Sequence, residues 1–494
     1  MGPRHRPDPA DGMSDGPDVI VVGYGPAGAS AAIAAHDAGR DVLVVEKTAA
    51  GGGNCRYAGG FLFDAPDPVA AEHVDALCFG RTDRAVIDAY VSGLHALSGW
   101  LEGLGATVAP FAPPPGRLPA SFPSWPSFPA GDEIRYAVVG GGEGRRGEAL
   151  WAVLDGAVRE RTIAVEHETP ARALLCADDG AVIGVVVERD GVGREVRAPG
   201  GVVLACGGFE GDPGLADAYL PLGPVTPVGH AANTGDGLRM AQAAGAALWH
   251  MYGFFGWFAF HAPGFAAPFA IDFFAPGFVF VDADGRRFAD ETGFEVHDRL
   301  RALATYLPEN PNRPKLPSWA IFDDATRRAG PLNGLLGTPN DYAWSADNAA
   351  EIERGWIAAG DGVAELAAAT GLDPEALAAT IETYNSAARA GRDDRFGRVP
   401  ETLVPLESRL YALPAWPGIA GTTGGPRHDP SARVLDPGGE PIAGLYAAGA
   451  VSLVWGHLID HGGGLTDAMV FGRLAGEHAA RRAGAAATGA DAAR

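Results

Sequence analysis

The sequence predicts an α/β fold in which a second domain, of α+β type, is inserted into the first. Three observations predict it. A glycine-turn βαβ unit lies near the N-terminus, further glycine clusters recur near the C-terminus, and a stretch of aromatic-rich composition separates the two. Because 494 residues can bury more than one core, we expect the glycine-rich ends to form one domain that the middle stretch covers.

The expected boundaries follow from these changes of composition. Residues 1–16 are a disordered arm, 17–247 and 417–485 the two parts of the glycine-rich domain, 248–416 the inserted domain, and 486–494 a tail. Helices are expected at 75–105, 147–159, 236–245, 361–371 and 373–390, and strands at 181–188 and 195–205. The Pro-rich run 111–130 is expected to be a long loop that borders the entrance of a site.

The βαβ unit spans residues 18–46. Residues 18–22 and 41–45 are short β-branched runs, typical of buried strands, and the Ala-rich residues 29–38 between them are helical. Gly23, Gly25 and Gly28 stand in G-x-G-x-x-G spacing after the first strand. This order of strand, glycine turn, helix, strand and acid predicts a dinucleotide site.

Each glycine of this turn has an expected role. Gly23 permits the tight turn, Gly25 lets a pyrophosphate approach the backbone, and Gly28 lets the helix pack close to the strand. The helix N-terminus offers free N–H groups to the phosphates. Glu46, which lies 18 residues after Gly28, is expected to bind ribose hydroxyls.

FAD and NAD share this fingerprint, so further motifs are needed to separate them. In chain order these are GGGNCRYAGG at 51–60, VVLACGGF at 202–209, NTGDG at 233–237, GLYAAG at 444–449 and GGGL at 462–465. The ordered set resembles the FAD-dependent flavoprotein family of fumarate reductase and succinate dehydrogenase, nearer its 3-ketosteroid dehydrogenase and tricarballylate dehydrogenase-like members. The resemblance implies FAD, a Rossmann-like FAD-binding domain, a capping domain inserted into it, and redox chemistry at a carbon–carbon bond next to a carbonyl.

The fingerprint and the resemblance together indicate the residues that contact FAD. They are Gly23, Gly25, Pro26, Ala27, Gly28, Glu46, Lys47, Gly53, Asn54, Cys55, Gly59, Gly60, Ala171, Ala205, Cys206, Gly207, Asn233, Asp236, Gly449, Ala450, Gly464, Leu465 and Thr466. A helix expected at 465–475 would turn its N–H groups toward the N1/C2=O edge of the flavin and stabilise the negative charge of the reduced form.

Three details of this set are open to more than one interpretation. Some family members carry a histidine in the 51–60 stretch that bonds covalently to the flavin; here there is none, and Cys55 is a buried thiol, so non-covalent FAD is expected. Asp236 accepts hydrogen bonds near the flavin or caps the following helix. Many relatives have an acid or amide where Ala450 stands, which weakens FAD binding here unless Ser452 substitutes.

Composition and charge exclude several classes of partner. The net charge of −23 disfavours nucleic acid and anionic membrane surfaces. There is no apolar run of about 18 residues and no secretory signal, so we expect no membrane span and a cytoplasmic location. The four cysteines include no CxxC pair, which argues against disulfides, iron–sulfur clusters and attached haem, and no metal site is expected.

Fumarate and succinate are not the expected substrates. In the fumarate reductases, cationic side chains hold two carboxylates and an arginine donates the proton. At the matching positions this sequence has Glu295, Gly421 and Asp460. Burial of a dicarboxylate beside two further carboxylates would be costly without cationic partners.

The residues beside the last glycine cluster are the first candidates for catalysis. The 3-ketosteroid dehydrogenases have a tyrosine here, whereas this sequence reads GHLIDHG at 456–462. Asp460 and His461 form an acid–histidine pair that suits a general acid or base at neutral pH, with Asp460 expected to orient the ring. The alternatives are a structural pair, or His457 as the acid–base group.

The stretch 249–280 holds 13 aromatic residues in 32, against 9% in the whole chain. Such density makes either an aromatic pocket wall or a plain core. The absence of a clean helical or strand period favours a pocket for a flat, apolar substrate. His250, Tyr252 and His261 are the polar groups within it; the first two, with Glu295, are the further catalytic candidates.

The sequence therefore predicts an FAD-dependent oxidoreductase that introduces or reduces a carbon–carbon double bond alpha,beta to a carbonyl. Hydride would pass at flavin N5 while an acid–base group moves the proton. The expected substrate is apolar and cyclic, such as a steroid, terpenoid or polyketide, and the electron donor or acceptor is external. Alternatives are hydroxylation or alcohol oxidation on the same scaffold, a tricarballylate-type dehydrogenase of a small carboxylic acid, or an idle flavoprotein that binds a partner.

Overall fold

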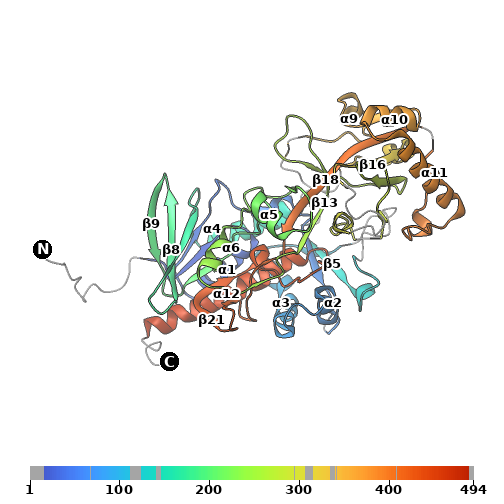
Figure 1. The fold of residues 1–494 in the computed structure, drawn as a ribbon. Coiled ribbons are helices and arrows are strands. Elements are labelled where there is room, and N and C mark those ends of the chain that lie inside the picture. The colour runs from blue at the N-terminus through green and yellow to red at the C-terminus, as the bar shows by residue number, and fades with distance from the viewer. Residues whose placement is uncertain are drawn as a thin grey trace.

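The computed structural model describes residues 16–66, 68–111, 124–140, 146–293, 295–305, 315–333, 340, 342–407 and 409–488. Most of the expected arm, residues 489–494 of the expected tail and positions 112–123 of the Pro-rich run lie outside these residues. Figure 1 shows two parts: one holds both ends of the chain, and the other carries the helices α9 (Ala349–Glu353), α10 (Val363–Thr370) and α11 (Pro374–Ala390).

The part with the chain ends is built on a six-stranded sheet. Its order is β20-β21-β10-β1-β2-β6, and it is parallel apart from the antiparallel pair β20 and β21. The strands are β1 (Val19–Val22), β2 (Val42–Val45), β6 (Ala164–Glu166), β10 (Val202–Leu204), β20 (Arg433–Leu435) and β21 (Pro441–Ala447). The central strands are apolar runs buried on both faces, as parallel sheets require, and the late strand β21 lies beside β10.

Two helices from opposite ends of the chain pack together on this sheet. They are α1 (Pro26–Asp37) and α12 (Gly463–Ala487). A Cβ added to Gly472 would lie 2.5 Å from the carbonyl oxygen of Ala27, and one added to Gly476 would lie 2.2 Å from that of Ala31. The two helices are therefore parallel and closer than larger side chains would allow, so both N-termini point the same way.

Smaller elements surround this sheet. The strands β3 (Phe61–Asp64), β4 (Val108–Pro110) and β5 (Arg135–Val139) form one three-stranded sheet, and β7 (Ala171–Cys176), β8 (Val182–Arg189) and β9 (Val192–Arg197) form another. The helices are α2 (Val69–Cys78), α3 (Arg84–Gly103), α4 (Arg146–Glu160), α5 (Pro213–Tyr219) and α6 (Asp236–Ala243). The helices expected over 75–105 are the end of α2 and the whole of α3. The expected strand 195–205 is divided between β9 and β10, because glycines 200 and 201 turn the chain from one sheet into the other.

The second part is built around one long strand, β18 (Leu410–Thr422). Its sheet has the order β14-β13-β18-β16-β15, with β11 and β17 also paired to β18. The bounds are β11 (Thr226–Pro227), β13 (Phe254–Phe260), β14 (Phe269–Ala270), β15 (Phe278–Val281), β16 (Ser318–Asp323) and β17 (Ala358–Gly360), with the short helices α7 (Arg301–Ala304) and α8 (Asp324–Arg328).

Two strand pairs connect the parts. In Figure 1, β18 runs from the first part toward α10, and β13 lies beside it. The short strands β12 (Leu248–Trp249) and β19 (Gly425–Pro426) pair next to them. The expected boundary at 416/417 falls inside β18, so the exact bounds of the two domains stay a prediction. The expected architecture, an α/β domain into which a second domain is inserted, is confirmed.

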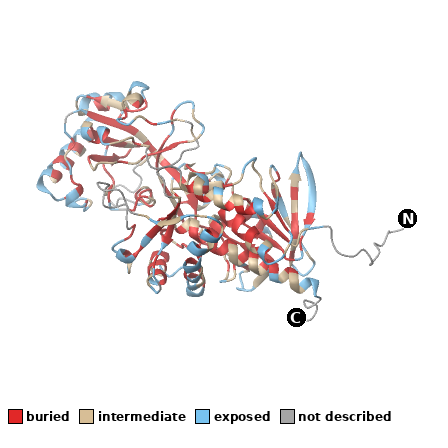
Figure 2. Ribbon diagram, turned by 180° about the vertical axis from the view of Figure 1, so that it is seen from behind, coloured by how far each residue is buried: buried red, intermediate tan, exposed pale blue. Residues whose placement is uncertain are grey.

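The aromatic stretch 249–280 forms mostly core, so the prediction that it lines a pocket was wrong for most of its members. Phe258 stacks on Phe280 at 4.1 Å and Phe273 on Phe278 at 4.0 Å between ring centroids. Figure 2 shows this burial along the strands of both parts. Phe254 and Phe258 of β13 lie in the core whereas Phe255 and Trp257 line a cavity, because successive strand residues face opposite sides.

Among the helices of the described residues, none combines the length and the apolar composition that crossing a membrane requires.

Candidate active site

The glycine turn after β1 leaves room for a ligand at one of its three positions. Gly23 has φ +101°, and a Cβ there would lie 2.5 Å from the carbonyl oxygen of Ala205. A Cβ on Gly28 would lie 2.0 Å from the carbonyl oxygen of Gly23, so this glycine is needed for packing. At Gly25 the nearest atom would be 3.9 Å away, so this backbone is open to a phosphate group.

A cavity runs along the carboxyl ends of β1, β2, β10 and β21, where a Rossmann-like sheet binds its ligand. Every residue expected to contact FAD lines this cavity, except Gly28 and Thr466. The hydroxyl of Thr466 lies 2.6 Å from the Tyr90 hydroxyl and donates to the carbonyl of Gly462 instead. The lining residues fit an extended dinucleotide held largely by backbone.

Glu46 stands at the end of β2, as a ribose-binding acid should. One of its oxygens accepts from the backbone N–H of Tyr24 at 2.9 Å and the other from that of Thr48 at 2.8 Å. Lys47 donates to the carboxylate of Asp236 at 2.7 Å. Asp236 does not cap α6, because Gly235 is the N-cap residue and no side chain caps this helix.

The N-terminus of α12 opens on the same cavity. The helix begins at Gly463, two residues earlier than expected, after Gly462 with φ +77°. Gly464 and Leu465 line the cavity, so the unpaired N–H groups of the first turn can meet a bound group with partial negative charge.

Two side chains that could have contacted FAD, the thiol of Cys55 and the hydroxyl of Ser452, are hydrogen-bonded within the protein instead. Burial raises the pKa of the Cys55 thiol to about 12, and this thiol donates to the carbonyl of Gly147. The hydroxyl of Ser452 is buried, donates to the carbonyl of Pro426 and accepts from the Trp249 indole. Ser452 therefore does not replace the polar group missing at Ala450.

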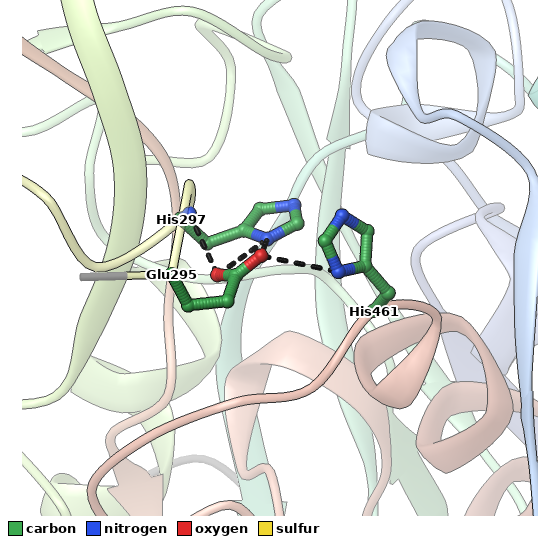
Figure 3. A group of neighbouring side chains, drawn as sticks. All are labelled: Glu295, His297 and His461. Carbon is green, nitrogen blue, oxygen red and sulfur yellow. Dashed lines mark hydrogen bonds and ion pairs between the residues drawn. The ribbon is translucent and has the colours of Figure 1, made fainter. Parts of the chain in front are cut away.

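At the other end of the cavity three side chains meet: Glu295, His297 and His461 (Figure 3). Nδ1 of His297 lies 2.9 and 3.0 Å from the two oxygens of Glu295, and Nδ1 of His461 lies 3.1 Å from one of them. Glu295 and His297 belong to the loop between β15 and α7, whereas His461 belongs to the loop before α12. The cluster thus joins the two parts of the molecule.

The carboxylate decides how both imidazoles are protonated. An ionised carboxylate only accepts hydrogen bonds. The hydrogen-bond network therefore assigns a proton to the Nδ1 of each imidazole that faces Glu295. In the neutral rings the lone pairs are then on Nε2. His297 lines the cavity, and its Nε2 has no hydrogen-bond partner among the described residues. His297 therefore presents a basic nitrogen to whatever occupies the cavity.

The two histidines differ in basicity. Burial lowers the pKa of His297, but the charge of Glu295 and its hydrogen bond outweigh burial and raise that pKa above the ordinary value. Burial and the neighbouring His297 hold the pKa of His461 well below the ordinary value. His297 is therefore the member of the cluster that exchanges a proton near neutral pH, while His461 stays neutral.

Asp460 does not orient the His461 ring, so that prediction was wrong. Its carboxylate accepts from Tyr136 at 2.7 Å, from His73 at 2.8 Å and from the backbone N–H of His461 at 2.6 Å. The ring of His461 instead contacts Glu295 and the hydroxyl of Ser124. Asp460 holds the loop, and its three partners already satisfy its buried charge.

The remaining candidates lie away from the cavity. His250 is bonded to the backbone of Leu453 and Arg81, and burial lowers its pKa to about 4. Tyr252 donates to the carbonyl of Gly456 at 2.8 Å. His261 contacts Thr226, and His457 contacts Arg81. Of the predicted catalytic residues, the structure brings only Glu295, Asp460 and His461 to the site.

Sequence inspection missed His297 and the supporting side chains Ser124, Tyr136 and His73. His297 stands two residues after Glu295, so an acid-x-histidine pattern was visible beside a residue already selected. The supporting side chains come from three other segments, and no local pattern connects them with His461.

Comparison with known proteins agrees with an FAD site in this chain. The family described as "FAD binding domain" matches residues 18–466. The 3-oxosteroid 1-dehydrogenase of Mycolicibacterium smegmatis is 30% identical over 96% of this chain and 98% of its own. The probable fumarate reductase Ifc3 of Shewanella frigidimarina is 29% identical over 96% of this chain and 76% of its own.

A solved structure extends the comparison to the fold. The crystal structure of 3-ketosteroid delta1-dehydrogenase from Sterolibacterium denitrificans, in complex with 1,4-androstadiene-3,17-dione, superposes with a TM-score of 0.81 at 25% identity. The alignment covers 95% of this chain and 100% of that one. The chain therefore belongs to the FAD binding domain family and is an FAD-dependent oxidoreductase that acts on CH–CH bonds.

Proposed function

We propose that the protein introduces or removes a double bond next to a carbonyl in an apolar, cyclic ketone, and that His297 moves the proton. The observation that carries the proposal is that His297 lines the cavity with its Nδ1 held by Glu295, while its Nε2 has no hydrogen-bond partner among the described residues. When bound, FAD supplies the hydride acceptor or donor.

The acid–base step belongs to the chain's own residues. In the oxidising direction, Nε2 of His297 takes the proton alpha to the carbonyl, and Glu295 stabilises the imidazolium that forms. His461, neutral and fixed by Glu295 and Ser124, holds the other side of this carboxylate. In the reducing direction the protonated His297 returns the proton to carbon.

The walls of the cavity support an apolar, cyclic substrate. Phe255, Trp257, Val296 and Ala270 line it beside His297. The Trp257 and His297 rings lie 4.7 Å apart, which leaves the imidazole against an aromatic wall. The 3-oxosteroid 1-dehydrogenase relative and the solved structure with bound 1,4-androstadiene-3,17-dione support a ring ketone in this place.

The positions that would hold fumarate argue against a dicarboxylate. Glu295 faces the two histidines and Asp460 is already bonded to His73 and Tyr136. A side chain at Gly421 would meet the Phe255 ring at 2.5 Å. Fumarate and succinate should therefore neither be turned over nor raise the melting temperature; stabilisation by millimolar fumarate would contradict this part of the proposal.

The proposal includes non-covalent FAD and an external redox partner. No histidine stands in the 51–60 stretch, and the Cys55 thiol stays protonated beside Gly147. Acid or heat should release all of the flavin, and yellow colour on the precipitated polypeptide would contradict this. The scattered cysteines support an electron donor or acceptor outside the chain.

The test is anaerobic reduction of the flavin by cyclic ketones, compared between wild type and His297→Ala. The flavin of the variant should be reduced ~10²–10⁴-fold more slowly, which is the range for a positioned acid–base group, while its spectrum and content stay unchanged. His261→Ala is the matched control, because His261 is an exposed histidine of the same part that contacts Thr226. Near wild-type rates in His297→Ala would contradict this role and would assign the proton transfer to His461 or to another residue.

A further inference from the structure

Arg146, the first residue of α4, is a cationic side chain that lines the cavity outside the acid–base cluster. Its guanidinium lies over two aromatic rings, 4.9 Å from the centroid of Phe61 and 5.2 Å from that of Phe111. Nε donates to the carbonyl of Gly59 at 3.2 Å. The rings and this bond hold the planar group in one orientation and leave its outer N–H groups for another partner.

The charge of Arg146 is not compensated within the described part of the chain. No carboxylate there lies within ion-pair distance of it, whereas Arg287 pairs with Glu291 and Arg301 with Asp298. Burial lowers its pKa, and no neighbouring charge contributes to that shift. A half-buried cation without a partner is costly, so a bound anion at this position would be strongly favoured.

Arg146 is also near the acid–base cluster. The Phe61 ring that carries its guanidinium meets the His461 ring edge-on, 5.6 Å between centroids. The cation and the cluster therefore contact the same phenyl ring, and both line the same cavity. One substrate in this cavity could therefore meet the cation with an acidic substituent and the cluster with its reacting carbon atoms.

We propose that Arg146 binds a carboxylate on the substrate, so that the natural substrate is a cyclic ketone with an acidic substituent. This inference rests on the function proposed above for the ketone, but the anion subsite itself does not. The guanidinium fork matches the two oxygens of a carboxylate, which a lysine or a neutral side chain would not. The apolar wall of Phe255 and Trp257 then contacts the ring between the two ends.

The test measures binding, so that it does not depend on turnover. The FAD-loaded protein is titrated calorimetrically with cyclohexanecarboxylate and with cyclohexanecarboxamide, which have the same shape but differ in charge. Wild type should bind the carboxylate roughly 10- to 100-fold more tightly, as expected for charge-assisted hydrogen bonds. Arg146→Gln should lose this preference, and Arg146→Lys should keep part of it.

Arg159→Gln is the matched control, because Arg159 lies on the same helix with its side chain 78% exposed and pairs with Asp155. It should keep the full preference. Equal binding of both ligands by wild type, absence of binding of either, or an unchanged preference in Arg146→Gln would overturn the inference. So would loss of FAD from both Arg146 variants, because Arg146 would then belong to the cofactor site.

The two proposals fail in different ways. A protein that prefers the carboxylate through Arg146, yet reduces its flavin with no oxo acid, keeps the subsite and loses the proposed function. A protein that oxidises neutral ring ketones and carboxylated ones with equal KM, in wild type and in Arg146→Gln alike, keeps the function and loses the subsite.

Discussion

The two ends of the cavity are built from different material. At the FAD end the walls are mostly backbone: glycines at the carboxyl ends of neighbouring parallel strands and the first turn of α12. At the substrate end the walls are side chains, the apolar Phe255 and Trp257 beside the imidazoles of His297 and His461, and they come from segments far apart in the sequence.

This difference separates affinity from chemistry. The FAD end depends on close packing of backbone, so an added methyl group there should weaken FAD binding, whereas an isosteric change of charge at the substrate end should not. The substrate end depends on a few protons and charges, so an isosteric change that removes a charge there should stop turnover and leave the flavin bound. Each end can therefore be broken without the other.

The largest effect is expected from Glu295→Gln at the substrate end. The amide keeps the size of the side chain and removes the charge that both imidazoles face, so turnover should fall ~10²–10⁴-fold with normal flavin content. The measurement is the anaerobic rate of flavin reduction. A variant that bleaches its flavin at the wild-type rate would show that the carboxylate has no role in proton transfer.

The pH profile sharpens this prediction. The oxidising direction needs neutral His297, whose pKa is raised above its ordinary value of 6.5 by Glu295 against the effect of burial. The kcat/KM of wild type should therefore rise with pH through a step above 6.5. In Glu295→Gln burial is opposed only by the more weakly acting charges of Asp298 and Asp460, so the step should move to lower pH; an unmoved step would assign it to another group.

The second effect is expected at the FAD end, from Gly28→Ala. The added Cβ would lie 2.0 Å from the carbonyl oxygen of Gly23, so α1 must shift away from β1 and carry the phosphate-binding turn with it. Overpacking of this kind costs about 1–3 kcal/mol, and the flavin content of the purified protein should fall. Gly99→Ala, where no atom lies within 4 Å of the new Cβ, should keep its flavin.

The same contrast explains what the sequence could predict. The FAD end is made of local motifs, so residues 18–46 and the ordered glycine motifs after them predicted much of its lining and two parts of one sheet. The start of α12 was misplaced by only two residues, because glycine neighbours leave several possible first positions.

The substrate end depends on tertiary contacts that no local pattern shows. Ser124 reaches His461 across 337 residues and His73 reaches Asp460 across 387. The aromatic stretch was misassigned because composition cannot tell a core from a wall; the pairing of β13 decides which residues face the cavity. His250 and Tyr252 were selected from that stretch and are bonded to backbone elsewhere.

A smaller effect is expected from Asp467→Asn, which changes a buried carboxyl of α12 behind the backbone wall of the FAD end. Burial raises the pKa of Asp467 to about 8 from an ordinary 3.8, while the backbone N–H of Val454 donates to it. The folded state therefore holds this proton more tightly than the unfolded state, and stability is lost as pH rises between the two values.

Asparagine cannot titrate, so Asp467→Asn should lack this loss. The difference in melting temperature between the variant and wild type should grow from pH 4 to pH 8 in favour of the variant, by an amount equivalent to about 1 kcal/mol or more. Thermal unfolding of the FAD-loaded proteins across this range is the measurement. A constant difference would mean that the pKa of Asp467 is the same in the folded and unfolded states.

The smallest effect is expected from chelation, and it decides how the substrate end works. The ligand atoms of Glu295, His297 and His461 lie within 4.8 Å of one another, the only such group of His, Cys, Asp and Glu in the described residues. A metal ion would need both Nδ1 atoms deprotonated, whereas the proposed acid–base cluster needs an Nδ1 proton between each imidazole and the Glu295 carboxylate. Dialysis against EDTA should therefore leave the rate of flavin reduction unchanged. A rate that falls on dialysis and returns with added Zn²⁺ would show that the cluster binds a metal ion. Glu295 would then be a ligand of that ion rather than the charge that raises the pKa of His297.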